Sequence, residues 1–220
     1  MKMKKIAAIA IFTFSVFGLK AQQFNSLLAS MLQDTMDTYV SQISNIKGMS
    51  ASVYIPGQGV WTGVARNSYD GQPITADMRF GIASNTKLFV SVMMLKLAEN
   101  NIIDLDDPLS DWLTISNVNI NSNATIRQLL NHSSGISDPF FAGPWFDTIN
   151  ANPNRVFTPN EVMNWVGAPL FNPGTSWSYS NTNYVLAGMV AESASGYSLG
   201  TLIRDSILDP LMQIPVKLTT

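Results

Sequence analysis

The sequence predicts a mixed α/β fold of the α+β kind, in which one helix and one β-hairpin precede a mainly helical region. Three observations support this class. Apolar residues recur at three- and four-residue steps over residues 28–46, as on one face of a helix. Two short β-like runs, 49–55 and 60–65, flank the turn-forming residues 56–59. From Ser84 onward, the apolar spacing is helical.

Taken in order, the first helix is expected to end before Gly48, which suits a helix C-terminus. A second helix follows Ser84, with Leu88, Val92, Leu95 and Ala98 on one buried stripe, and stops near Asn100. One hairpin is too small to form a stable sheet in water. Further strands are therefore expected as its partners.

Shorter helices are expected over residues 125–131, 183–193 and 199–207. Thr158 and Glu161 have the spacing of a capping box, with Pro159 at the first helical position. Residues 137–159 and 168–178 are rich in Pro, Gly and Asn and are expected to form loops.

Composition excludes several kinds of site. The 220 residues include no Cys and one His, which excludes a disulfide framework and a thiolate nucleophile and disfavours a zinc centre, so we expect no metal and no cofactor. A net charge of −2 without basic clusters in the body of the chain disfavours nucleic acid as a partner. Only 13% of residues are charged, which suits an exported protein with a neutral polar surface.

The N-terminus has the pattern of a signal peptide. Lys2, Lys4 and Lys5 precede an uncharged apolar run over residues 6–19, and Ala21 offers a small residue for cleavage. The run is shorter than the ~20 residues that a membrane-spanning helix needs. We therefore expect a signal peptide at 1–21, a single domain at 22–220, and no stable membrane span after cleavage.

Candidate chemistry begins at Ser84, which has Lys87 three positions later on the same helix face. A serine hydroxyl needs a partner that takes its proton, and a first helical turn favours developing negative charge. The spacing alone is weak evidence, because Ser44 and Lys47 repeat it near the end of the first helix, where we interpret it as structural. A helix-capping Ser84 with a solvated Lys87 is the alternative.

Four blocks in one order make the case stronger. They are Phe-Gly-Ile-Ala-Ser-Asn-Thr-Lys at 80–87, Leu-Asp-Asp-Pro-Leu at 105–109, Ile-Arg-Gln-Leu-Leu-Asn-His-Ser-Ser-Gly-Ile at 126–136, and Pro-Gly-Thr at 173–175 followed by Tyr-Ser-Asn at 179–181. With them, residues 80–212 resemble the penicillin-recognising serine hydrolases, in particular the branch of class C β-lactamases, D-alanyl-D-alanine carboxypeptidases and related esterases. The resemblance implies a β-lactamase/transpeptidase-like fold in a bacterial periplasmic or secreted protein.

The resemblance also implies roles for four residues. Ser84 would attack the carbonyl carbon of a β-lactam, D-Ala-D-Ala peptide (muropeptide) or ester and form an acyl-enzyme, with its own backbone N–H as one oxyanion donor. Lys87 and Tyr179 would manage the proton, and Asn181 would bind the substrate's amide and position Lys87. Burial lowers the pKa of an amine and a neighbouring ammonium lowers that of a phenol, so either group could be the base.

Each assignment has a structural alternative. Tyr179 could be a core tyrosine and Asn181 a helix cap. His132 invites a Ser-His-Asp interpretation, which we disfavour because the sequence has no Gly-x-Ser-x-Gly elbow; in the resembling family this His lies at a structural helix end. Asp106 and Asp107 are more simply capping residues than an acid pair. Four aromatic residues are expected in the core rather than in a substrate cleft: Trp145, Phe146, Trp165 and Trp177.

The sequence departs from the family in one respect. The family's third box, Lys-Thr-Gly or His-x-Gly on a strand beside the nucleophile, is absent after Asn181, where the only Lys is Lys217. The hairpin also lacks the partner strands that a stable sheet needs, which agrees with the absence of the strand that carries the third box. We therefore expect a C-terminally truncated form of the fold that lacks the C-terminal strands. Either it is an acyl-enzyme hydrolase completed by a further segment, or it is a non-catalytic remnant used as a binding or structural module.

Overall fold

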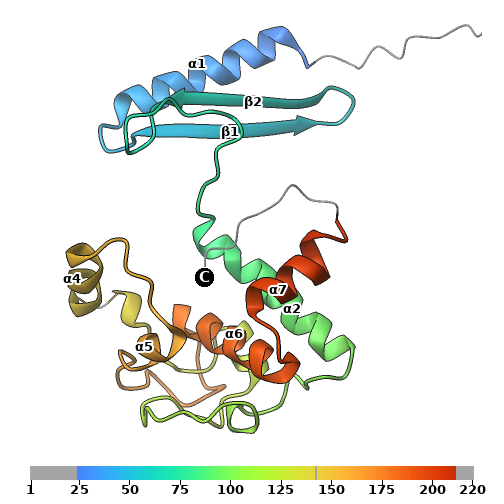
Figure 1. The fold of residues 1–220 in the computed structure, drawn as a ribbon, viewed down its shortest axis with the longest axis vertical. Coiled ribbons are helices and arrows are strands. Elements are labelled where there is room, and N and C mark those ends of the chain that lie inside the picture. Colours follow the sequence, from blue (N-terminus) through green and yellow to red (C-terminus); the bar gives the residue numbers. More distant parts are fainter. Residues whose placement is uncertain (1–23, 142, 212–220) are drawn as a thin grey trace, which may run out of the picture. The chain divides into compact units, whose positions relative to one another are not determined.

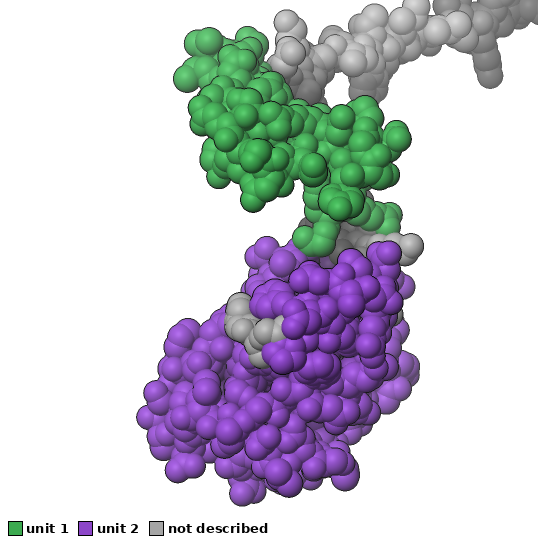
Figure 2. Space-filling view, turned by 90° about the vertical axis from the view of Figure 1, so that its left-hand side faces the viewer, with its two compact units in different colours: residues 1–81 green, residues 82–220 purple. Residues whose placement is uncertain are grey.

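The computed structural model describes residues 24–141 and 143–211. The chain divides into two compact units, Met1–Gly81 and Ile82–Thr220 (Figure 2). We describe each unit by itself. The predicted signal peptide at 1–21 lies outside the described residues and stays a prediction.

The first unit is a helix packed on a β-hairpin. Helix α1, Ser26–Gln42, runs along one face of strands β1, Gly48–Ile55, and β2, Gly59–Arg66 (Figure 1). The strands are antiparallel, and Ile55 pairs with Gly59 across the turn. Their core is small, with only three hydrophobic residues in its buried cluster: Met36, Val40 and Ala65.

The predicted end of the first helix was wrong by four residues. Helix α1 ends at Gln42, and Gly48 begins β1 instead of capping a helix. A Cβ atom on Gly48 would lie 2.6 Å from the Asn67 backbone oxygen and 2.8 Å from that of Ala65. This glycine therefore permits close packing of backbones at the start of the hairpin.

The second unit is mainly helical and is built around α6, Asn181–Ser195. Leu186, Ala187 and Val190 of this helix are fully buried. Four helices pack against it: α2, Thr86–Glu99; α3, Ile126–Leu130; α5, Pro159–Met163; and α7, Leu199–Ile203, which continues as a π-helical turn, Arg204–Leu208. Helix α4, Gly143–Ala151, lies farther from α6 (Figure 1) and contacts the 3-10 turn Pro139–Phe141. The capping boxes at Thr125 and Thr158 are both formed. The predicted α+β class, an N-terminal helix and hairpin followed by a helical region, is confirmed.

Helix α2 buries a different face from the one predicted. Leu88 and Leu95 are 65% and 51% exposed, whereas Met94 is fully buried. The helix is apolar on all sides, so its spacing does not determine which side faces inward. Packing against α6 and α7 selects the face with Val90 and Met94.

Helix α4 lies within a segment that the sequence predicted to be a loop. It begins at Gly143 with Pro144 in its first turn, where the missing N–H of proline costs no helical hydrogen bond. Trp145 anchors it, because this residue is 2% exposed and packs against the rings of Phe140 and Phe157. Tertiary packing thus overrides a composition typical of loops.

None of the helices in residues 24–141 and 143–211 combines the length and the apolar character that crossing a membrane requires.

Candidate active site

Ser84 lies in a 3-10 turn, Ala83–Asn85, immediately before α2. Ala83 has a φ of 46°, a left-handed conformation that costs an L-residue about 1–2 kcal/mol. The turn leads into α2, and Lys87 in the first turn of that helix donates a hydrogen bond from Nζ to Ser84 Oγ at 3.3 Å. The capping alternative for Ser84 does not hold, because Asn85 occupies the N-cap position of α2.

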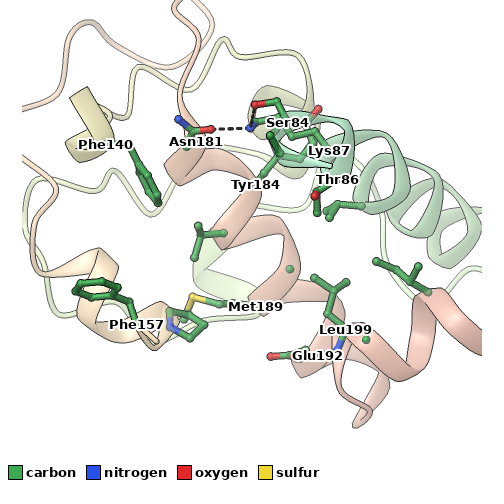
Figure 3. Close-up of a pocket in the computed structure, with 17 residues that line it drawn as sticks. Ser84, Thr86, Lys87, Phe140, Phe157, Asn181, Tyr184, Met189, Glu192 and Leu199 are labelled. Carbon is green, nitrogen blue, oxygen red and sulfur yellow. Dashed lines mark hydrogen bonds between the residues drawn. The ribbon is translucent and has the colours of Figure 1, made fainter. Parts of the chain in front are cut away.

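The segment before α6 brings two further predicted residues to Ser84. The Tyr179 hydroxyl lies 2.8 Å from Ser84 Oγ, and it also donates to Asn181 Oδ1 at 3.3 Å. Lys87 Nζ donates to the same Asn181 oxygen at 2.6 Å (Figure 3). The four residues singled out in the sequence therefore form one hydrogen-bonded cluster.

The cluster lowers the pKa of Tyr179. Burial by itself raises the pKa of this phenol, but hydrogen bonding to Lys87 and Ser84, together with the positive charge of Lys87, outweighs that effect. Lys87 Nζ lies 4.9 Å from the centroid of the Tyr179 ring. The phenol is thereby more readily deprotonated than an ordinary tyrosine.

Asn181 is the first residue of α6, and Ser180 holds the N-cap position. The Asn181 side chain therefore does not cap its own helix. Its orientation comes from Asp138, whose Oδ2 accepts hydrogen bonds from the backbone N and from Nδ2 of Asn181, both at 2.8 Å. With Nδ2 held by Asp138, Oδ1 is directed to Lys87.

The sequence analysis missed Asp138. It follows the block that ends at Ile136 and lies in a segment predicted to be a loop, so neither a motif nor a periodic pattern marks it. Its function depends on two contacts with a residue 43 positions away. No sequence signal short of the assembled fold identifies such a contact.

A buried polar network joins the segments on either side of the cluster. Ser134 Oγ donates to Asn183 Oδ1 at 2.7 Å, and Thr182 Oγ1 donates to the Ser137 backbone oxygen at 2.9 Å. Ser134, Thr182 and Asn183 are at most 1% exposed. Because buried polar groups are costly when unpaired, these bonds fix one register between the two segments.

His132 serves this same arrangement and not a Ser-His-Asp triad. Its Nδ1 accepts a hydrogen bond from the Ser180 backbone N at 3.1 Å, and its ring stacks on that of Tyr179. Asp106 and Asp107 also have structural partners. Asp106 pairs with Arg127 at 2.7 Å, and Asp107 accepts from the Trp112 indole at 3.1 Å.

A pocket of about 700 Å³ opens beside Ser84 and extends along α6. Figure 3 shows Ser84, Lys87 and Asn181 at one end and Glu192 and Leu199 at the other. Apolar side chains make up most of the lining, including Val90, Phe140, Phe157, Val185, Met189, Leu199 and Ile203. None of the four aromatic residues weighed in the sequence lines this pocket. Trp145 is in the core as expected, but the core prediction was wrong for the other three, because Phe146, Trp165 and Trp177 are 49%, 38% and 64% exposed.

The described residues contain no group of three or more His, Cys, Asp or Glu side chains that could hold a metal ion.

Comparison with known proteins gives one family. The model of the family described as Beta-lactamase matches residues 32–215. Over 142 residues the chain is 34% identical to penicillin-binding protein 4* of Bacillus subtilis, which covers 63% of this chain and 30% of that protein.

Solved structures agree. A D-stereospecific amidohydrolase from Streptomyces sp. superimposes with a TM-score of 0.72 at 31% identity, covering 84% of this chain and 54% of that one. The D-amino acid amidase from Ochrobactrum anthropi, complexed with D-phenylalanine, gives a TM-score of 0.71 at 28% identity, covering 85% and 51%. The chain thus spans about half the length of these structures and less than a third of the Bacillus protein.

Proposed function

Because the chain belongs to the Beta-lactamase family of serine hydrolases, we propose that it acts by forming an acyl-enzyme on Ser84. The observation that carries the proposal is the contact of Ser84 Oγ with both Tyr179 and Lys87. A serine hydroxyl is activated by an adjacent base, and a phenol with a lowered pKa at 2.8 Å is suitably placed.

The reaction divides into two halves. The phenolate of Tyr179 accepts the Oγ proton while Oγ bonds to the carbonyl carbon, and the proton then passes to the leaving amine or alkoxide as its bond to carbon breaks. Water then gives a proton to the same phenolate as its oxygen bonds to the acyl carbon, and this proton passes to Ser84 Oγ as the ester bond breaks. We assign the base to Tyr179 because its oxygen is closer to Ser84 Oγ than Lys87 Nζ is, at 2.8 against 3.3 Å.

Lys87 and Asn181 support this step. The ammonium of Lys87 favours the phenolate of Tyr179 and is itself held by Asn181 Oδ1 at 2.6 Å. Of the two N–H groups of Asn181 Nδ2, one is bonded to Asp138, and the other can donate to the acyl-side amide of a substrate. The Ser84 backbone N–H is one donor to the oxyanion, and loss of such a donor costs ~3–4 kcal/mol of barrier.

The pocket guides the choice of substrate. Its apolar lining, which includes Phe140, Phe157 and Met189, favours acyl groups with a bulky apolar side chain. Of the two similar structures, one is a D-stereospecific amidohydrolase and the other a D-amino acid amidase. We therefore propose amides of apolar D-amino acids first, with D-Ala-D-Ala peptides, esters and β-lactams as the wider class.

We further propose that the protein is exported to the bacterial periplasm or secreted. The support is the pattern of Lys2, Lys4 and Lys5, the apolar run and Ala21. Mass spectrometry of the N-terminus of the expressed protein tests the proposal. A chain that begins near Gln22 supports it, and a chain that retains Met1 contradicts it.

Hydrolysis assays test the activity. The protein and its Ser84→Ala variant are incubated with D-phenylalanine amide, a D-Ala-D-Ala peptide, a nitrophenyl ester and a chromogenic β-lactam. We expect turnover or a burst of one equivalent with at least one substrate, and loss of either with Ser84→Ala. Equal rates for the two proteins would contradict the proposal.

A non-catalytic module is the second candidate. It is favoured by one observation, the absence of Lys-Thr-Gly or His-x-Gly after Asn181. This candidate predicts binding of the same ligands with no acyl-enzyme. Calorimetric binding that is equal in the protein and in Ser84→Ala, without a covalent product, would support it.

A further inference from the structure

His132 contacts the chain on both sides of Tyr179. Its backbone oxygen accepts a hydrogen bond from Ser178 N at 3.0 Å, and its Nδ1 accepts one from Ser180 N at 3.1 Å. The residues that flank Tyr179 are therefore both bonded to this one residue. His132 itself has a φ of 63°, a left-handed conformation that few residue types adopt readily.

The imidazole also packs on the phenol. The rings of His132 and Tyr179 are stacked, with centroids 4.7 Å apart and an interplanar angle of 30°. Trp177 meets the imidazole edge-on at 6.0 Å, and Tyr184 lies at 5.3 Å. Three aromatic rings thus fix the imidazole, and the imidazole fixes the plane of Tyr179.

We propose that His132, in its neutral form with the proton on Nε2, is the positioning residue that holds the Tyr179 hydroxyl against Ser84. This inference rests on the proposed function, in which that contact activates the nucleophile. His132 does not transfer a proton to or from Ser84. It acts through Tyr179, by one hydrogen bond on each side and by the stacked ring.

The hydrogen bond from Ser180 requires this neutral form. An imidazolium carries a proton on both nitrogens, so Nδ1 could no longer accept from Ser180 N. The phenol rings of Tyr179 and Tyr184 lie beside the imidazole, and the charges of Lys87 from α2 and of Asp138 act on it. Burial, and secondarily the charge of Lys87, lower the pKa of His132, against a smaller opposing effect of Asp138.

The first test is nuclear magnetic resonance of the ring nitrogens. His132 is the only histidine in the chain, so its nitrogen signals need no assignment by mutation. We expect an unprotonated Nδ1 and a protonated Nε2, with a titration midpoint below the 6.5 of a free imidazole. A proton on Nδ1, or a midpoint at or above 6.5, would overturn the proposal.

The second test separates the hydrogen bond from the stacking. His132→Asn tolerates the left-handed backbone and keeps an acceptor near the Nδ1 position, but it removes the ring. His132→Phe keeps a ring and removes the acceptor. Ser133→Ala is the matched control, because within residues 24–141 and 143–211 the Ser133 hydroxyl bonds to Asn131 and not to the segment of Tyr179.

We expect Ser84 to be acylated about 100-fold more slowly in both His132 variants, because displacement of an activating group by about 1 Å costs rates of this order. If the acylation rate of the wild type, plotted against pH, has an inflection below pH 6.5, this inflection should be absent from His132→Asn, which has no imidazole to protonate. Folded variants with wild-type rates would overturn the proposal. Slow variants that keep the inflection would also overturn the proposal, because a general loss of structure would then explain their slow acylation.

A third readout does not need activity. Carbon NMR of labelled tyrosine, with the Tyr179 signal identified by its loss in Tyr179→Phe, reports the ionisation of this phenol. We expect its pKa to rise in both His132 variants, as the ring moves away from Lys87, and to stay unchanged in Ser133→Ala. Absence of acylation in the wild type would contradict the proposed function, while this readout and the tautomer would still decide the role of His132.

Discussion

In the proposed function, the chemistry of the site depends on Tyr179. Its hydroxyl touches Ser84 Oγ at 2.8 Å and Asn181 Oδ1 at 3.3 Å, and Lys87 lies over its ring. Tyr179→Phe should keep the ring and remove the proton acceptor. We expect acylation of Ser84 to slow by about 10²–10⁴, the usual contribution of general base catalysis, in stopped-flow or labelling assays.

The matched control for this substitution is Tyr197→Phe, because the Tyr197 side chain is 64% exposed and lies outside the pocket lining. Its acylation rate should equal that of the wild type. If Tyr179→Phe is acylated at the wild-type rate, Tyr179 is not the general base, and that role would be assigned to Lys87.

His132 gives the stability of the fold a dependence on pH. Its pKa is lowered in the folded chain, so the unfolded chain binds a proton that the folded one excludes. As the pH falls below 6.5, the free energy of unfolding should therefore decrease until the folded pKa is reached. Urea titrations between pH 7 and 5 measure this slope, and in His132→Asn the slope should be smaller.

The faces of α2 provide a test at the level of an element. Met94 and Leu95 are neighbours in one helix, but Met94 is fully buried and Leu95 is half exposed. Met94→Ala should lower the free energy of unfolding by about 2–5 kcal/mol, the usual cost of a cavity, and Leu95→Ala by much less. Equal losses by chemical denaturation would show that the side of α2 with Leu95, which the sequence predicted to be buried, is buried as well.

The turn after α3 depends on a glycine. Gly135 has a φ of 75°, and a Cβ atom there would lie 2.0 Å from the Phe171 backbone oxygen. Gly135→Ala should cost about 2–5 kcal/mol through the left-handed backbone and the clash together. Gly196→Ala is the control, with a φ of 76° and open space around it, and should cost about 1–2 kcal/mol. Similar midpoints of thermal unfolding for the two variants would contradict this account.

For the molecule as a whole, the two units have cores of very different size. The first has three buried residues in its cluster, whereas the second is built on a much larger set around α6. We expect amides of α1 and the hairpin to exchange with solvent faster than those of α6, because little apolar burial opposes their opening. Hydrogen exchange with mass spectrometry measures both in one sample, and equal protection would contradict the expectation.

Sequence predicted the parts of this structure that local rules decide. The capping box at Thr158, the hairpin between β1 and β2, and the placing of Ser84 with Lys87 at the start of α2 all follow from spacing over a few residues. That Tyr179 and Asn181 belong beside Ser84 came from the resemblance of ordered blocks, not from spacing.

The features of the fold and the site that the sequence did not predict depend on tertiary packing. Asp138 acts through contacts with a residue 43 positions away, which leave no periodic trace. The buried face of α2 is chosen by α6 and α7, since the helix is apolar all round. Helix α4 is held by Trp145 packing against Phe140 and Phe157, against a composition typical of loops.

The central claim is that Ser84 becomes acylated. The most direct measurement is peptide mapping by mass spectrometry after the protein has reacted with a fluorescent penicillin and, separately, with an ester-type phosphonate. The account predicts one equivalent of adduct, located on Ser84 and absent from Ser84→Ala. A folded protein that carries no adduct, or carries it on another serine such as Ser44, would contradict the account.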